Sequence, residues 1–165
     1  MPVRWLVTAA CAALVASAAY GAAELAGGEA PDFVLKSVHG QNLRLSEYRG
    51  EVVMLTFWAT WCGDCRAQLE QLGRMQADYR DAGVELLAVS LDQNARQAAR
   101  TAESLGARYP VLHDIDGSVG RLYAVERMPS MVLIDRTGVV REVFEGYARG
   151  NERQYLERVQ ALLRE

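Results

Sequence analysis

The sequence predicts an α/β fold in which a mixed central sheet is flanked by helices on both faces. Two near-continuous apolar runs, 51–60 and 84–92, are rich in aliphatic residues, which is typical of strands buried on both faces. A helical pattern follows each run, and this alternation predicts parallel pairing of the strands. The segment 130–146 holds two apolar runs joined by the tight turn DRTG, which predicts a final antiparallel hairpin.

Patterns of apolar and turn-forming residues predict the elements around the first buried strand. Before it, 31–50 contains two short apolar runs around HGQN, which predicts a hairpin. After it, apolar residues recur at helical spacing from Leu69 to Tyr79, and Gly83 is placed to end that helix.

The second half of the chain predicts two further helices and one short mixed segment. A helix is expected over 94–106, with either Asn94 or Asp92 as its N-cap. The segment 108–125 predicts a short extended piece, a turn and a short helix. A C-terminal helix is expected over 151–165, beginning at Asn151 as its N-cap.

Composition argues against one class of function. The chain has 165 residues, enough for one domain with a substantial core, and 50% of them are hydrophobic. The net charge is −3, and the arginines are scattered along the sequence. A nucleic-acid-binding protein would show a basic stripe, so we expect no nucleic-acid partner.

The first 23 residues differ in character from the rest. A single charge, Arg4, precedes an apolar, alanine-rich run that ends in small residues, which is typical of a secretory signal peptide. The run is also about long enough to be an uncleaved membrane anchor. Both alternatives predict a periplasmic or otherwise extracytoplasmic location. Residues 24–30 are expected to be a flexible lead-in, and 31–165 to form the folded domain.

Two cysteines outside that leader, Cys62 and Cys65, are separated by two residues at the predicted start of a helix. Unpaired N–H groups and the helix dipole favour a thiolate there, and a thiolate is the nucleophile of thiol–disulfide exchange. We expect Cys62 to be the exposed, attacking thiol and Cys65 the buried, resolving thiol. Trp61 would shield the pair and offer an apolar contact to a substrate.

Two other roles for these cysteines are less favoured by the sequence. A purely structural disulfide would close so short a loop that it would constrain the unfolded chain little. A zinc site normally needs four ligands, and only His39 and His113 remain as histidine partners, at no familiar spacing. We therefore expect a redox-active disulfide, with no metal and no separate cofactor.

The segment VERMPSMVLID supplies a candidate surface for the substrate. Pro129 precedes a predicted strand, where it cannot donate a hydrogen bond to the sheet. A cis Met128–Pro129 bond would turn the backbone groups of Met128 outward, toward a substrate chain. A trans proline that simply begins the strand is the alternative.

The chain resembles the thioredoxin superfamily, and within it the extracytoplasmic TlpA/ResA-like thiol–disulfide oxidoreductases. The resemblance covers nearly all of 30–165 and rests on APDFVL, LSEYRGEVVMLTFWATWCGDC, MPSMVLIDRTGVV and EGYARGNERQYLERVQALL. It implies a thioredoxin fold with an N-terminal β-hairpin extension and a central insertion. It also implies Cys62 as nucleophile, Cys65 as resolving thiol and Pro129 as a cis-proline.

The resemblance also implies partners. Members usually reduce selected exported proteins, such as apocytochromes or copper-site assembly factors, and a membrane thiol relay usually re-reduces them. We therefore expect a protein disulfide as substrate and such a relay as electron donor.

Three positions depart from the pattern of these relatives. Family members commonly carry a glutamate where this chain has Gln68, and thioredoxin has a buried aspartate where this chain has Thr56. Asp64 stands where relatives often carry proline. Its charge would disfavour a nearby thiolate and make the couple more reducing; alternatively, it is a solvated acid at a helix N-terminus. With Gly63 and Trp61, it forms the set of residues expected to tune the redox potential.

Two other functions stay open at this point. A peroxiredoxin-like thiol peroxidase shares the opening APDFVL, but its site needs a proline and a threonine ahead of a single reactive cysteine, and here only Thr60 is present. A non-enzymatic Cu(I) carrier or assembly module could use the two thiolates with Met128 and Met131 as soft ligands.

Overall fold

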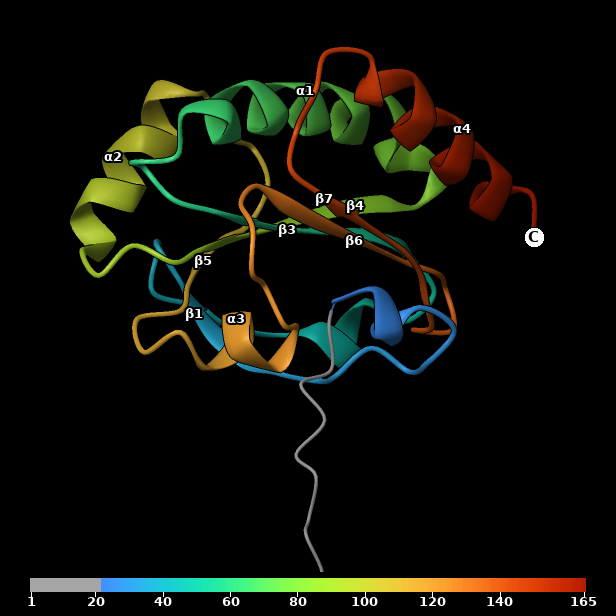
Figure 1. The fold of residues 1–165 in the computed structure, drawn as a ribbon, viewed down its shortest axis with the longest axis horizontal. Helices are drawn as coiled ribbons and strands as arrows, with labels where there is room; N and C mark the ends of the chain where they lie inside the picture. Colours follow the sequence, from blue (N-terminus) through green and yellow to red (C-terminus); the bar gives the residue numbers. More distant parts are fainter. Residues whose placement is uncertain (1–21) are drawn as a thin grey trace, which may run out of the picture.

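The computed structural model describes residues 22–165, which form a seven-stranded sheet with helices on both faces (Figure 1). The strands are β1 (Val34–Ser37), β2 (Asn42–Arg44), β3 (Val52–Trp58), β4 (Val84–Ser90), β5 (Val111–His113), β6 (Ser130–Ile134) and β7 (Val140–Glu145). The α-helices are α1 (Gly63–Tyr79), α2 (Ala95–Ser104), α3 (Ser118–Leu122) and α4 (Asn151–Leu163). Short 3-10 helices are η1 (Ala22–Leu25), η2 (Leu45–Tyr48) and η3 (Arg80–Ala82). The predicted α/β fold class is confirmed.

The strand order β2-β1-β5-β4-β3-β6-β7 brings the ends of four strands to one edge of the sheet. β3, β4 and β5 run parallel, and β6 runs antiparallel to β3. Trp58, at the end of β3, pairs with Ser90 of β4, and Ser90 pairs with His113 of β5. On the other side of β3, β6 begins with Ser130, which pairs with Phe57. The carboxyl ends of three strands and the start of a fourth therefore meet at the same edge.

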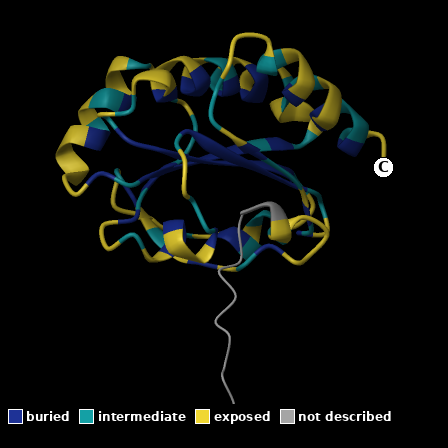
Figure 2. Cartoon of the chain, in the orientation of Figure 1, coloured by how far each residue is buried: buried dark blue, intermediate teal, exposed yellow. Residues whose placement is uncertain are grey.

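Side chains of β3 alternate between two hydrophobic cores. Val53, Leu55 and Phe57 face the core on the α3 side, whereas Val52 and Met54 face the core beneath α1 and α4. Figure 2 shows the sheet as the buried layer between helices that expose their outer faces. This burial on both faces explains why the sequence of β3 is a continuous apolar run.

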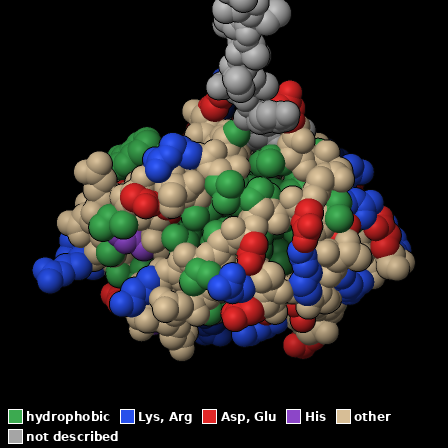
Figure 3. Space-filling view, turned by 90° about the horizontal axis from the view of Figure 1, so that it is seen from below, with side chains coloured by type: hydrophobic (Ala, Val, Ile, Leu, Met, Phe, Trp, Pro, Cys, Tyr) green, Lys and Arg blue, Asp and Glu red, His purple; other side chains and the backbone are tan. Residues whose placement is uncertain are grey.

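In Figure 1, α1, α2 and α4 lie on one face of the sheet, and the short helix α3 lies on the other. Viewed from that side, apolar side chains reach the surface among charged ones (Figure 3). Ile115, just before α3, and Leu122, at its end, are 67% and 47% exposed.

The segment 24–30 packs against the domain, where the sequence predicted a flexible lead-in. The N–H of Ala30 donates to the carbonyl of Gly138 (2.9 Å), and the carbonyl of Gly28 accepts from Val140 (2.9 Å). The side chain of Ala30 is buried in the core on the α3 side. No local sequence pattern predicts these contacts, because they are backbone hydrogen bonds to a distant turn. The expected leader at 1–23 lies, as far as residue 21, outside the described residues.

Helix ends resolve the alternatives that the sequence left open. Asn94 is the N-cap of α2, since its side chain accepts from the N–H groups of Arg96 and Gln97. Asp92 is therefore not needed at that helix. α4 begins after Gly150, which has a left-handed backbone, so the predicted N-cap role of Asn151 is wrong.

Candidate active site

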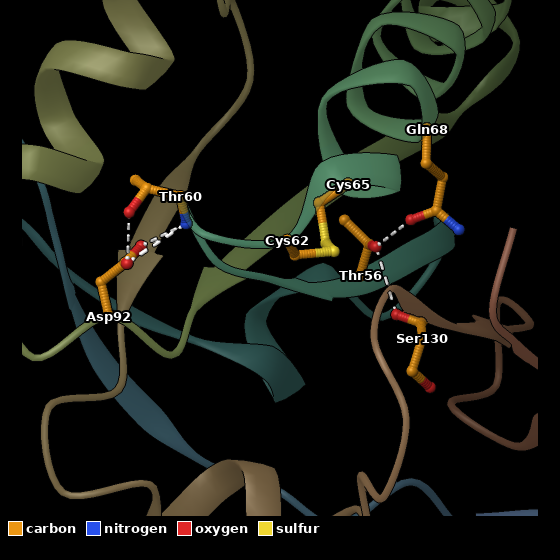
Figure 4. Close-up of a disulfide and its surroundings, with 7 residues drawn as sticks. All are labelled: Thr56, Thr60, Cys62, Cys65, Gln68, Asp92 and Ser130. Carbon is orange, nitrogen blue, oxygen red and sulfur yellow. Dashed lines mark hydrogen bonds between the residues drawn. A yellow bond between two sulfur atoms is a disulfide. The ribbon is translucent and has the colours of Figure 1, made fainter.

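Cys62 and Cys65 form a disulfide at the N-terminus of α1 (Figure 4). Cys62 is the N-cap residue with extended backbone, and Cys65 lies in the first turn of the helix. Cys65 is fully buried, whereas Cys62 is partly exposed. The pair therefore lies at the end of α1 where the helix dipole is positive, and Cys62 is the more exposed of its two residues.

A groove of about 410 Å³ runs beside Cys62. Its lining combines apolar side chains with charged ones: Trp61, Leu91, Val125 and Met128 are apolar, and Asp64, Glu126 and Arg127 are charged. Trp61 is 70% exposed, which is high for so large an apolar side chain. The groove thus offers apolar contacts to whatever chain approaches Cys62.

Met128 and Pro129 join the site from the loop before β6. Their peptide bond is cis, one of the two alternatives that the sequence left open. Met128 packs near Cys62 in the cluster around Trp58, whereas Met131 is fully buried in the separate core beneath α1 and α4. Only Met128 therefore lies near the two cysteines.

Comparison with known sequences assigns this chain to a known family. The profile of the AhpC/TSA family matches residues 26–143. The chain belongs to the AhpC/TSA family. Among curated relatives in this group, thiol-disulfide oxidoreductase ResA of Geobacillus thermodenitrificans is 34% identical over 134 residues, which are 81% of this chain and 77% of that protein. ResA of Geobacillus kaustophilus is 37% identical over 120 residues, or 73% of this chain and 69% of the relative.

Solved structures share the thioredoxin-like fold of this chain. A crystal structure from Chlorobium tepidum, provisionally assigned as a thiol:disulfide interchange protein DsbE, is 36% identical with a TM-score of 0.80, and the match covers 84% of this chain and 97% of that one. A solution structure from Bacteroides thetaiotaomicron, provisionally assigned as a protein disulfide isomerase, is 27% identical with a TM-score of 0.78, covering 85% of this chain and 91% of that one. This AhpC/TSA chain is therefore a ResA-like thiol–disulfide oxidoreductase with a thioredoxin fold.

The two positions that lack the expected carboxylates are joined to each other in this AhpC/TSA member. The hydroxyl of Thr56, on β3, donates to the amide oxygen of Gln68, on α1, over 2.7 Å. The amide nitrogen of Gln68 lies 3.3 Å from the hydroxyl of Tyr155 on α4. Gln68 follows Cys65 by about one helical turn, so this neutral network lies on the buried side of Cys65.

No sequence pattern identified Asp92, a buried acidic residue near the site, as a candidate site residue. Asp92 follows β4 and is 4% exposed, and its carboxylate accepts from both the N–H and the hydroxyl of Thr60. Thr60 lies two residues before Cys62 (Figure 4). The signal in the sequence was an aspartate at the carboxyl end of a buried strand, where functional side chains often gather.

Residues 22–165 contain no group of three or more His, Cys, Asp or Glu side chains that could hold a metal ion. Within the same residues, no helix is both long and apolar enough to cross a bilayer.

Proposed function

We propose that this oxidoreductase works outside the cytoplasm and reduces disulfides of selected exported proteins. The observation that carries the proposal is the unequal exposure of the pair: Cys62 is open to the groove, while Cys65 is 0% exposed behind it. Such a pair can form a bond to a large partner at one sulfur only, which suits a protein disulfide as substrate.

The proposed exchange has two steps and uses no cofactor beyond the two cysteines. The Cys62 thiolate attacks one sulfur of the substrate disulfide, forming a mixed disulfide and releasing the other substrate sulfur as a thiolate. Cys65 then loses its proton and attacks the Cys62 sulfur, which forms the Cys62–Cys65 disulfide and releases the second substrate thiolate. The substrate gains two electrons, and the protein loses two.

The groove and the loop before β6 supply substrate contacts in this proposal. Among the described residues, no protein group forms a hydrogen bond with the backbone N–H or carbonyl of Met128. Those groups are therefore free to pair with an extended substrate chain beside Pro129. Trp61 would cover the apolar residues next to the substrate cysteine.

The electron donor and the location of the protein are also part of the proposal. A membrane thiol relay would reduce the Cys62–Cys65 disulfide after each turnover, and residues 1–23 would direct the domain across the membrane or hold it there. Proteins of cytochrome or copper-site maturation are the proposed substrates. The support for these points is the leader-like sequence and the similarity to ResA.

Trapping tests the function directly. A Cys65→Ser variant of the full chain, produced in its own host, cannot complete the second step and should accumulate mixed disulfides on Cys62. A Cys62→Ser variant is the matched control, because its remaining thiol is buried. The proposal predicts exported proteins with paired cysteines in the first sample alone, and equal recovery from both variants would contradict it.

Met128 beside the cysteine pair gives the Cu(I) carrier a specific observation in its favour. Two thiolates and one thioether form a soft ligand set. Titrating the reduced protein with Cu(I) under anaerobic conditions separates the two functions. Tight binding that weakens in a Met128→Leu variant, without any trapped partner, would favour the carrier.

A further inference from the structure

We propose that Asp92 is a positioning residue for Cys62, which it holds in place through Thr60. The inference rests on the thiol–disulfide chemistry of the cysteine pair and does not depend on which protein is the substrate. Asp92 is buried but does not cap α2, so its burial has no explanation in the helix ends.

The Asp92 carboxylate accepts hydrogen bonds from both donors of Thr60, its backbone N–H and its hydroxyl. The Thr60 N–H lies 3.1 Å from Oδ1 and 3.0 Å from Oδ2, and the Thr60 hydroxyl lies 2.7 Å from Oδ1. Figure 4 shows the Asp92 side chain reaching the loop that leads from β3 to Cys62. Hydrogen bonds to an ionised carboxylate are about twice as strong as neutral ones, so this is a firm attachment.

The carboxylate is itself fixed to the sheet. The hydroxyl of Ser90 donates to its Oδ2 (2.8 Å), and the N–H of Asp92 donates to the Ser90 hydroxyl oxygen (3.1 Å). The backbone carbonyl of Asp92 lies 2.6 Å from Nε2 of His113, on β5. Because Asp92 is 4% exposed, water has little access to replace these partners. The loop before Cys62 is therefore tied to two strands.

The attachment matters because Cys62 works at a helix end. The loop between Thr60 and Cys62 contains only Trp61, and the N–H of Cys62 bonds to the carbonyl of Ala59 (3.1 Å), which closes a tight turn. Favourable interaction of an anion with a helix N-terminus falls off within the first turn. A shift of the Cys62 sulfur away from α1 would therefore weaken the stabilisation of its thiolate.

Two substitutions at Asp92 distinguish the effect of its hydrogen bonds to Thr60 from the effect of its negative charge. Asp92→Asn and Asp92→Ala both remove the negative charge, but an asparagine oxygen can still accept from the Thr60 N–H. The readout is the alkylation rate of Cys62 by iodoacetamide in the reduced full chain, followed on the peptide that carries Cys62. The equilibrium constant for reduction by dithiothreitol is measured alongside it.

We expect Asp92→Ala to show slower alkylation at neutral pH than Asp92→Asn, by about two- to five-fold, which is the range of helix-end effects on an anion. Its disulfide should also be less readily reduced by a similar factor. Equal rates and equal equilibrium constants in the two variants, both folded by circular dichroism, would overturn the proposal. Failure to trap a partner through Cys65→Ser would leave these measurements unaffected.

A second pair keeps the test usable if Asp92→Ala does not fold. Thr60→Ser retains the hydroxyl that bonds Asp92, whereas Thr60→Val replaces it with a methyl group of similar size. We expect the serine variant to match the wild type and the valine variant to lose alkylation rate. Equal rates in these two variants would likewise contradict the proposal.

Thr137→Val is the matched control for both pairs. Thr137 makes the same kind of bond to Asp135, with its hydroxyl 2.6 Å from Oδ1, but it lies in the turn between β6 and β7. That turn is at the opposite end of the sheet from Cys62, because Ile134 pairs with Val53 near the start of β3. Its loss should lower stability without changing the reactivity of Cys62.

Discussion

The hydroxyl of Thr56 and the side-chain amide of Gln68 are hydrogen-bonded over 2.7 Å, and both side chains are 0% exposed (Figure 4). The same hydroxyl lies 3.2 Å from the carbonyl of Ser130, and the amide nitrogen of Gln68 reaches Tyr155. β3, β6, α1 and α4 thus meet in one neutral network on the buried side of Cys65.

Placing a carboxyl group in that network should make stability depend on pH. In a Gln68→Glu variant, burial will raise the pKa of the introduced carboxyl above its value in the unfolded chain. The carboxyl is then protonated at acid pH and must ionise as pH rises. Stability is therefore greatest below the pKa that the carboxyl has in the unfolded chain, and it falls as pH rises above that pKa. We expect a loss of about 1–3 kcal/mol in unfolding free energy at pH 7, measured by urea denaturation of the oxidised protein.

Gln68→Met is the control for this change, since it also removes the amide but cannot ionise. It should lose stability by a similar amount at pH 5 and at pH 7. A Gln68→Glu variant whose stability is the same at both values would show that the introduced carboxyl reaches water.

Removing the charge of Asp64 should raise the reduction potential of the pair. Asp64 is exposed in the first turn of α1 and lines the groove with Cys62, so its charge opposes a thiolate there. We expect Asp64→Asn to increase the equilibrium constant for reduction by dithiothreitol, by no more than about five-fold, because unit charges about 4 Å apart interact by about 1 kcal/mol in water.

Salt distinguishes this effect from a change in packing. The difference between Asp64→Asn and wild type should shrink at about 1 M salt, where the Debye length falls to about 3 Å. Glu70→Gln, which removes an exposed acid further along α1, should leave the equilibrium unchanged. An unchanged or lower potential in Asp64→Asn would refute the tuning role.

Truncating Trp61 should slow the reduction of protein substrates more than that of small disulfides. The side chain is 70% exposed, so Trp61→Ala should change the unfolding free energy by less than about 0.5 kcal/mol. Reduction of a protein disulfide, such as that of insulin, should slow by about ten-fold, the usual cost of losing an aromatic interface anchor. The reaction with a small aromatic disulfide should change much less.

Ile115→Ala provides the comparison for Trp61. Ile115 is 67% exposed but does not line the groove beside Cys62. It should behave as wild type with both substrates. Equal slowing with the protein and the small disulfide in Trp61→Ala would indicate a role in the chemistry instead of in substrate contact.

Acid should destabilise the protein partly through Asp135. Burial raises the pKa of this carboxyl, but the hydrogen bonds from Thr137, Val139 and Arg141 outweigh it and hold the pKa below its ordinary value. A group with a lowered folded pKa adds stability above its unfolded pKa, near 3.9, and loses it as pH falls through the folded value. Asp135→Asn should therefore cost about 1–2 kcal/mol at pH 7 and much less near pH 2.

Denaturant midpoints of wild type and Asp135→Asn, measured from pH 7 down to pH 2, check this expectation. The two curves should converge as pH falls, while reduction of the Cys62–Cys65 disulfide is unaffected. Curves that stay parallel over this range would mean that the carboxyl is equally acidic in the folded and unfolded chains.

The order and type of the main elements could be predicted because they follow from local patterns. The apolar run of β3 and the helical spacing after Leu69 report burial along the chain itself. Residue type alone did not determine the helix starts, since Asn94 and Asp92 are equally good caps. The wrong cap at Asn151 has the same origin, because Gly150 satisfies the turn by its backbone.

By itself, the sequence determined the fold class and the position of the Cys62–Cys65 pair at a helix start, since strand, CxxC and helix are contiguous. Only the tertiary structure decided what surrounds that pair. Thr56, Gln68 and Tyr155 come from three elements, and Asp92 meets Thr60 from 32 residues away. Such contacts depend on strand order and register, which bring the ends of β3 and β4 to one edge of the sheet, and no local pattern encodes them.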